Sequence, residues 1–127
     1  MGACTNGNYA SQYRLPGTFC PIADFDLVKH AAEECEKLGV HFMVGNILSS
    51  DTFYDDANSG MEWAKMGVLG VEMESAALYC NAARAGKKAL CICTVSDSFV
   101  YPEENTTAEE RQTSFTKMME VALEIAE

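Results

Sequence analysis

The sequence contains no hydrophobic run long enough to cross a membrane. Its longest uncharged apolar stretch lies near Ala89–Val95, whereas a membrane-spanning helix needs about 20 apolar residues. The first residues, Met1–Asn6, have neither the basic start nor the apolar stretch of a secretory signal. We therefore expect a cytoplasmic protein that has no membrane partner.

Basic residues are also scarce. Nine lysines and arginines stand against nineteen aspartates and glutamates, which gives a formal net charge of -10 at pH 7. A chain this acidic repels nucleic acid backbones and anionic lipid surfaces. Nucleic acid is therefore not expected as a partner, although a phosphate-bearing small substrate is compatible if a local site supplies positive charge.

The six cysteines form no Cys-x-x-Cys pair and no Cys/His group with the spacing of metal ligands. Cys91 and Cys93 stand two residues apart in an apolar, strand-like run, so they share one face of the expected strand. A metal or redox pair is one interpretation. We favour the other, two buried small side chains in a reducing compartment, and we expect no metal site.

Repeats, low-complexity tracts and Gly/Ser linkers are absent too, so we expect the 127 residues, 48% of them hydrophobic, to form one compact unit. Hydrophobic periodicity and end signals predict helices at 23–38, 62–66, 75–85 and 107–126, and strands at 40–48, 68–73 and 88–96. Strands that alternate with helices favour an α/β sheet covered by helices. Ligands of such sheets usually bind at the carboxyl ends of the strands, so candidate residues are sought there.

Two glutamates lie at the end of the second expected strand, where it passes into a helix. Glu72 and Glu74 flank Met73, and acidic residues at a helix start favour the helix dipole, so capping is one interpretation. A carboxylate in this place can also accept hydrogen bonds from the neighbouring hydroxyls of a sugar. The residues alone leave both interpretations open.

Asp97 follows the third expected strand. It is either a turn former or a general acid that burial keeps neutral. Arg111 lies fourteen residues further on, after an acidic loop. A returning loop would bring it beside Asp97; otherwise it is an ordinary exposed helix residue.

After the first expected strand, Phe53 and Tyr54 either cover a core or stack on a planar ring.

Six segments along the chain carry a family resemblance. Three contain the strand-end residues: Gly-Val-Glu-Met-Glu-Ser-Ala-Ala (70–77), Thr-Val-Ser-Asp (94–97) and Thr-Thr-Ala-Glu-Glu-Arg-Gln (106–112). The others are Gly-Ala-Cys-Thr (2–5), Ile-Ala-Asp-Phe-Asp (22–26) and Val-Gly-Asn-Ile-Leu-Ser-Ser-Asp-Thr-Phe-Tyr (44–54). Together, and in this order, they resemble the bacterial hexameric type of purine nucleoside phosphorylase. The resemblance implies a three-layer α/β/α fold with a mixed central sheet, of which residues 1–127 are the C-terminal, nucleoside-binding half.

The resemblance also implies roles for eight residues. Phe53 stacks on the base, Val71 and Glu72 line the base and sugar pocket, Met73 and Glu74 hold the ribose, Ser96 and Asp97 meet the purine, and Arg111 assists Asp97. In this scheme Asp97 protonates N7 of the departing purine while phosphate attacks the sugar.

The implied reaction is a glycosyl transfer of purine salvage, in which phosphate and a purine (deoxy)ribonucleoside give the base and (deoxy)ribose 1-phosphate. The family implies a homo-oligomer that needs no cofactor, and it places the phosphate-binding residues mostly in the N-terminal half, which this chain does not match. We therefore predict that the 127-residue chain alone is inactive. Two alternatives stay open: a methylthioadenosine-type nucleosidase, which uses water, and a non-catalytic nucleoside-binding fragment. Both 6-oxo and 6-amino purines remain candidate substrates.

Overall fold

The computed structural model describes residues 1–113 and 115–126. The chain divides into two compact units. The first unit comprises residues 1–29 and 43–91, and the second comprises residues 30–42 together with the described part of 92–127. The assignment of residues 1–127 to a single family domain stays a prediction.

The first unit is built on a small parallel sheet. Its strands are β1 (Ala3–Thr5), β2 (Ile47–Ser49) and β3 (Val71–Glu72), paired in that order. The register aligns Ala3 with Ile47 and Leu48 with Val71, and an antiparallel bridge joins Gly2 to Ile22 beside β1. Parallel strands that alternate with helices agree with the α/β class expected from the sequence.

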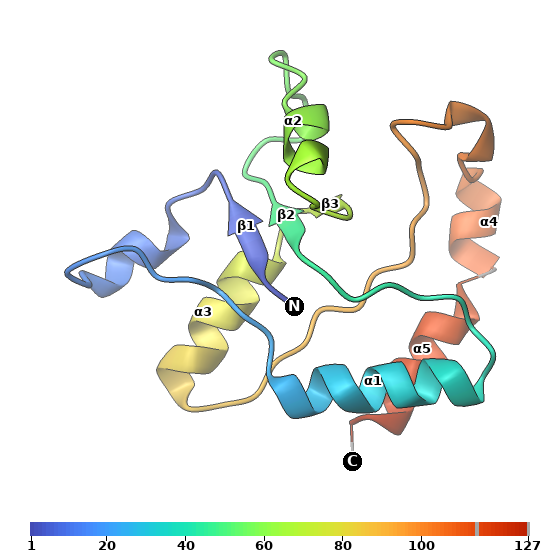
Figure 1. Cartoon of the computed structure of the whole chain (residues 1–127), viewed down its shortest axis with the longest axis horizontal. Helices are drawn as coiled ribbons and strands as arrows, with labels where there is room; N and C mark the ends of the chain where they lie inside the picture. The colour runs from blue at the N-terminus through green and yellow to red at the C-terminus, as the bar shows by residue number, and fades with distance from the viewer. Residues whose placement is uncertain (114, 127) are drawn as a thin grey trace. The chain divides into compact units, whose positions relative to one another are not determined.

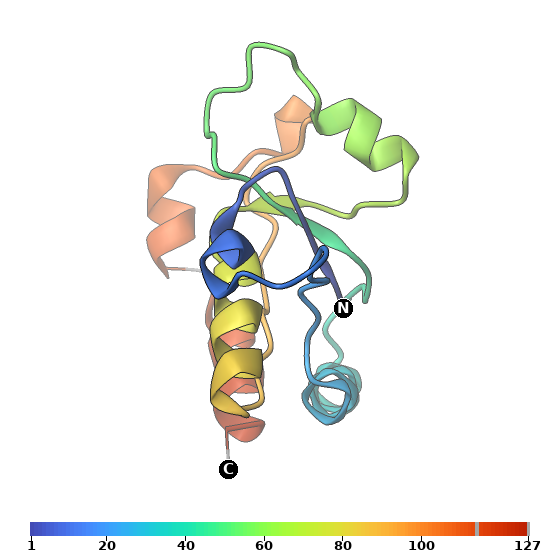
Figure 2. The same cartoon turned by 90° about the vertical axis from the view of Figure 1, so that its left-hand side faces the viewer.

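Helix α3 (Ser75–Ala85) packs against this sheet in the first unit. Both views show α3 running below β1 (Figure 1, Figure 2). The buried core is formed by Ala3 of β1 with Ala76 and Tyr79 of α3. Only Met73 and Glu74 separate β3 from α3, so both candidate glutamates stand at this junction: Glu72 ends β3 and Glu74 precedes α3.

The helices of the first 91 residues begin and end close to the predicted positions. They are α1 (Phe25–Lys37), α2 (Gly60–Lys65) and α3, preceded by a short 3-10 helix, η1 (Tyr9–Tyr13), which the sequence did not predict. The Asp24 carboxylate accepts the N–H of Leu27 at 3.1 Å and so caps the start of α1. Gly86 adopts φ 63 directly after α3, which is the left-handed conformation that commonly ends a helix.

The strands differ more from the prediction. β2 and β3 are shorter than the expected 40–48 and 68–73, and β1 was not predicted at all. The strand expected at 88–96 is absent from the structure. Part of its backbone has other partners: the carbonyl of Ala89 accepts the N–H of Asp24 at 2.9 Å, and the N–H of Cys91 donates to the Tyr79 hydroxyl at 3.0 Å. An apolar run favours a strand, but a strand also needs a neighbouring strand with which to form ladder hydrogen bonds. The two hydrogen bonds of Ala89 and Cys91 go to a loop and to a side chain instead.

The second unit contains a short 3-10 helix and two α-helices in its C-terminal part. They are η2 (Pro102–Glu104), α4 (Ala108–Thr113) and α5 (Thr116–Glu124). The single helix expected over 107–126 is therefore wrong, because Phe115 adopts the non-helical values φ -90 and ψ 40. Val121 of α5 is 1% exposed and lies in the interior of this unit.

The start of α4 agrees with the sequence. The Thr107 N–H donates to the Glu110 carboxylate at 2.7 Å, and the Glu110 N–H donates back to the Thr107 hydroxyl at 3.2 Å. This reciprocal pair is a capping box, the arrangement typical of a Thr-x-x-Glu pattern at a helix start. Hydrogen bonds from the backbone and the hydroxyl of Thr107 lower the pKa of Glu110 below its ordinary value.

Candidate functional site

Asp97 and Arg111 form an ion pair in the second unit. Nη2 of Arg111 donates to Oδ1 of Asp97 at 2.8 Å, and the Ser96 hydroxyl donates to Oδ2 at 2.7 Å. Both carboxylate oxygens therefore have a hydrogen-bond donor. Three of the residues selected from the sequence thus lie in direct contact.

The loop between Asp97 and Arg111 folds back on itself and brings the two residues together. The Ser98 N–H donates to the Asn105 side chain at 2.6 Å, while the Ser98 hydroxyl accepts the N–H groups of Val100 at 3.2 Å and Tyr101 at 2.9 Å. The Thr106 N–H then donates to the Ser96 carbonyl at 2.8 Å. These bonds close the loop, so the returning path expected from the sequence is present.

The ion pair is open to solvent. The side chain of Asp97 is 40% exposed and that of Arg111 is 47% exposed, so Asp97 is not buried within the described part of the chain. A neighbouring guanidinium favours the charged form of a carboxylate. The pair therefore has the geometry that stabilises a carboxylate from which a proton has already departed.

Glu72 caps α3, in agreement with the first of the two interpretations considered from the sequence. Its carboxylate accepts the backbone N–H groups of Glu74 and Ser75, both at 2.7 Å, and also the Ser75 hydroxyl. The first N–H groups of a helix have no partner within the helix. The carboxylate of Glu72 is therefore already engaged with the protein backbone.

Glu74 and its neighbours are more accessible. Val71 is 46% exposed and Met73 is 40% exposed, and Glu74 is exposed as well. Within residues 1–113 and 115–126, no group donates a hydrogen bond to the Glu74 carboxylate. The turn between β3 and α3 thus presents one engaged carboxylate and one that remains available to a ligand, with two apolar side chains close by in sequence.

Phe53 and Tyr54 belong to a loop of the first unit and pack on each other. Their ring centroids lie 5.0 Å apart with an interplanar angle of 78°, an edge-to-face arrangement. Phe53 is 77% exposed and Tyr54 is 86% exposed. They do not cover a core, so the first of the two sequence-based interpretations is wrong, and both rings are accessible to a planar ligand.

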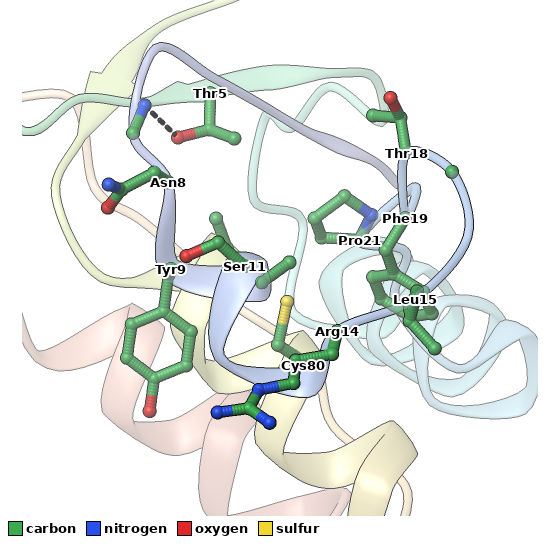
Figure 3. A pocket seen from close by; sticks show the side chains of 14 residues that line it. Thr5, Asn8, Tyr9, Ser11, Arg14, Leu15, Thr18, Phe19, Pro21 and Cys80 are labelled. Carbon is green, nitrogen blue, oxygen red and sulfur yellow. Dashed lines mark hydrogen bonds between the residues drawn. The ribbon is translucent and has the colours of Figure 1, made fainter.

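The first unit also contains a cavity of about 390 Å³ that the sequence did not reveal. Its walls come from β1, η1, the loop that follows η1, and α3; they include Thr5, Tyr9, Arg14, Leu15, Phe19 and Cys80 (Figure 3). None of the eight predicted site residues lines it. No local sequence signal predicts this cavity, because the hydroxyls of Tyr9 and Tyr13 hold η1 in place by donating to Asn81, 68 or more residues away.

Two other sequence expectations concern metals and membranes. Across residues 1–113 and 115–126, no three His, Cys, Asp or Glu side chains gather in a way that could hold a metal ion. No helix in that same part of the chain is long and apolar enough to cross a membrane.

Cys91 is half-buried and Cys93 is exposed, so the prediction that both are buried is wrong for Cys93.

Comparisons with known proteins give consistent results. Residues 2–127 match the family described as the phosphorylase superfamily. A purine nucleoside phosphorylase DeoD-type from Clostridium novyi (strain NT) is 54% identical over 129 aligned residues, which cover 100% of this chain and 54% of the relative. The proteins of the same description from Geobacillus sp. (strain WCH70) and Xenorhabdus nematophila are 47% and 48% identical, over 99% and 98% of this chain and 53% and 52% of theirs.

A solved structure supports the fold. The crystal structure of purine nucleoside phosphorylase from Toxoplasma gondii in complex with immucillin-H matches with a TM-score of 0.78 at 18% sequence identity. The match covers 98% of this chain and 52% of the other. It shows the shared fold and confirms the α/β class expected from the sequence. The chain spans about half the length of the curated relatives it matches.

Proposed function

Because the chain belongs to the phosphorylase superfamily, as its match over residues 2–127 shows, we propose that it provides the base- and ribose-binding part of a purine nucleoside phosphorylase. Such an enzyme cleaves the N-glycosidic bond of a purine (deoxy)ribonucleoside with inorganic phosphate and serves purine salvage in the cytoplasm. Relatives at 47–54% identity bear that name. They support the proposal for the half of their length that this chain covers.

The observation that carries the proposal is the contact between Asp97 and Arg111 at 2.8 Å. When the bond between the sugar C1′ and the purine N9 breaks, its electron pair passes to the base. Protonation of N7 by the carboxylic acid form of Asp97 neutralises the departing purine, and Arg111 stabilises the carboxylate that results. An oxygen of phosphate attacks C1′ from the opposite face and forms (deoxy)ribose 1-phosphate.

The residues predicted in the first unit have, taken by themselves, the chemistry for contacts with a nucleoside. Phe53 presents an exposed ring for stacking on the base. The available carboxylate of Glu74 accepts hydrogen bonds from the ribose hydroxyls, while Val71 and Met73 offer apolar contacts. Glu72 contributes by fixing the turn between β3 and α3 through its hydrogen bonds to Ser75.

Phosphate would be bound by groups outside these 127 residues. The side chain of Lys88 is already paired with Asp26 at 2.7 Å and with Asp24 at 3.6 Å. Arg14 lies at the cavity of the first unit and no second cation lines that cavity. We therefore propose that the complete site needs a complementary part of the family domain, and that the assembled enzyme is a homo-oligomer with no cofactor.

The chain covers about half the length of its relatives, and this also favours a second candidate function, a non-catalytic nucleoside-binding unit. Such a protein binds purine nucleosides and shows no phosphate-dependent turnover. The nucleosidase alternative differs in another way, since it would release free ribose or a thioribose without any dependence on phosphate.

The first experiment is intact mass and oligomeric state, followed on the same sample by calorimetric titration with inosine and adenosine and by turnover with and without phosphate. We expect nucleoside binding and no turnover by the 127-residue species. Asp97→Asn should weaken binding of the purine, because the carboxyl group is lost while the shape is kept. In a complemented, active assembly, Asp97→Asn should lower turnover about a hundred- to ten-thousandfold.

Absence of any nucleoside binding by a folded chain would contradict both the phosphorylase and the binding-unit proposals. Phosphate-independent release of the sugar would identify a nucleosidase instead. Phosphorolysis by the pure 127-residue species would contradict the proposal that phosphate is bound elsewhere.

A further inference from the structure

The hydroxyl of Thr106 contacts the guanidinium of the Asp97–Arg111 pair. It donates to the Ser96 carbonyl at 2.8 Å and accepts from Nε of Arg111 at 3.2 Å. The directions of these bonds are fixed, because a carbonyl has no proton to give and Nε of arginine cannot accept. One hydroxyl therefore links the backbone that precedes Asp97 to the guanidinium of Arg111.

The backbone of Thr106 makes two further contacts in the same place. Its N–H donates to the Ser96 carbonyl at 2.8 Å, and its carbonyl accepts from Nη2 of Arg111 at 3.0 Å. Nη2 carries two protons, so one reaches Thr106 and the other reaches Asp97 at 2.8 Å. The plane and the direction of the guanidinium are thus set by Thr106 on one side, and Asp97 receives the remaining proton of Nη2.

The burial of Thr106 sets it apart from its neighbours. Of residues 101–112, all of them described, Thr106 is half-buried and every other residue is exposed. An arginine on an exposed helix ordinarily samples many rotamers, and ordering such a side chain costs about 1.5–2 kcal/mol of rotamer entropy. Hydrogen bonds to a partly buried partner already restrict the orientation of Arg111. Less rotamer entropy is then lost when Arg111 contacts Asp97 in the nucleoside complex.

Thr107 performs a separate task, although it is the same residue type in the next position. Its hydroxyl and N–H serve Glu110 in the capping box. The capping box therefore determines where α4 begins. The Arg111 guanidinium bonds to the hydroxyl and the carbonyl of Thr106, so the side chains of the two threonines have different partners.

We propose that Thr106 is a positioning residue, whose hydroxyl and carbonyl hold the Arg111 guanidinium against Asp97 so that the arginine is in place when Asp97 gives up its proton. The proposal rests on the proposed function of this site, because it assigns that proton transfer to Asp97. Its structural part, the dependence of Arg111 on Thr106, stands on contacts that do not need a substrate.

The test is NMR of the full 127-residue chain with ¹⁵N-labelled arginine, following the Nε–H signal of Arg111 and its exchange with water. Thr106→Val keeps the shape and removes the hydroxyl. We expect its Nε–H exchange to rise about three- to tenfold, as the loss of one net hydrogen bond predicts. Thr106→Ser restores the hydroxyl and should restore slow exchange. Thr116→Val, the same substitution at an exposed position of α5, is the matched control and should change nothing.

Unchanged Nε–H exchange in Thr106→Val would overturn the proposal, as would equal effects of Thr106→Val and Thr116→Val. If the backbone amide spectrum shows that Thr106→Val does not fold, Thr106→Ala removes the hydroxyl without adding a methyl group and is judged by the same criterion. Inosine titration of the unsubstituted chain is run in parallel. If inosine does not bind but Nε–H exchange rises in Thr106→Val, the proposed function alone is contradicted. If inosine binds but Nε–H exchange is unchanged in Thr106→Val, the role of Thr106 alone is contradicted.

Discussion

Glu72 and Glu74 stand two residues apart, yet their carboxylates have different surroundings. Glu72 accepts hydrogen bonds from two backbone N–H groups at the start of α3 and from the Ser75 hydroxyl. Glu74 is exposed, and its backbone forms the first non-helical position before α3. The same residue type therefore stabilises the fold at one position and is available to a ligand at the other.

This difference predicts opposite results for two alanine substitutions. Glu72→Ala should lower the free energy of unfolding by about 1 kcal/mol, because the start of α3 loses its cap, as measured by urea unfolding. Glu74→Ala should change stability by less than about 0.5 kcal/mol and should weaken nucleoside binding in calorimetry. A stability loss for Glu74→Ala equal to that for Glu72→Ala would contradict this division of roles.

At the scale of the element, the end of α3 depends on one backbone conformation. Gly86 adopts φ 63, and a Cβ built there meets no atom within 4 Å. Any cost of a side chain at this position is therefore conformational and does not come from crowding. Gly70 has the same free space without a positive φ, so the two glycines form a matched pair.

We expect Gly86→Ala to lower the free energy of unfolding by about 1–2 kcal/mol, since non-glycine residues are strained in the left-handed region. Gly70→Ala should be neutral, or stabilise the protein by up to about 1 kcal/mol by restricting the unfolded chain. Both are measured by urea unfolding at neutral pH. Equal effects of the two substitutions would show that φ at Gly86 does not determine the stability of this helix end.

The start of α4 should depend on pH. Hydrogen bonds from the Thr107 backbone and hydroxyl lower the pKa of Glu110. A carboxyl whose folded pKa is lowered stabilises the folded state above its unfolded pKa of about 4.3, and this contribution is lost as the pH falls through the lower folded value. The backbone amide signal of Thr107 should therefore move as the pH is lowered below about 4.3. In Glu110→Gln that movement should disappear; its persistence would assign the change to another group.

At the scale of the whole molecule, the two units differ in how much they bury. The first unit contains the three paired strands and the buried Ala76, Tyr79 and Cys80 of α3. In the second unit the most buried described side chains are Cys35 at 9% and Val121 at 1% exposure. Local stability generally follows buried contacts and protected hydrogen bonds.

Hydrogen exchange of the native chain should reveal this difference. We expect the slowest amides in the first unit, for example those of Leu48 and Ser50, which donate to the carbonyls of Gly70 at 2.9 Å and Glu72 at 2.8 Å. The amides of α2 and α4, helices of six residues each, should exchange fastest among the α-helices. Uniform protection across both units would indicate that they unfold together.

The candidate site could be predicted from sequence to different degrees at its different parts. Residue type and position at an expected strand end were sufficient to select Glu72, Glu74 and Asp97, because strand ends of α/β sheets concentrate ligand-binding groups. Arg111 was selected through the loop that was expected to return it to Asp97. The different roles of Glu72 and Glu74 were not predictable. Glu72 and Glu74 carry the same group, and which of them meets the helix start depends on the path of the backbone in the turn. Thr106 was missed as well, since nothing in a run of two threonines shows which hydroxyl faces the arginine.

The sequence by itself determined the positions of α1, α2 and α3 closely, because helix ends depend on interactions within a few residues, whereas the single helix expected over 107–126 is two helices, α4 and α5. Only the tertiary structure decided the extent of the strands, the return of the loop that joins Arg111 to Asp97, and the cavity beside η1. Those features need partners far away in the chain: β1 pairs with a strand 44 residues on, and the hydroxyls of η1 find Asn81 on α3. Local chemistry fixes a helix end, whereas a strand or a site exists only when distant segments meet.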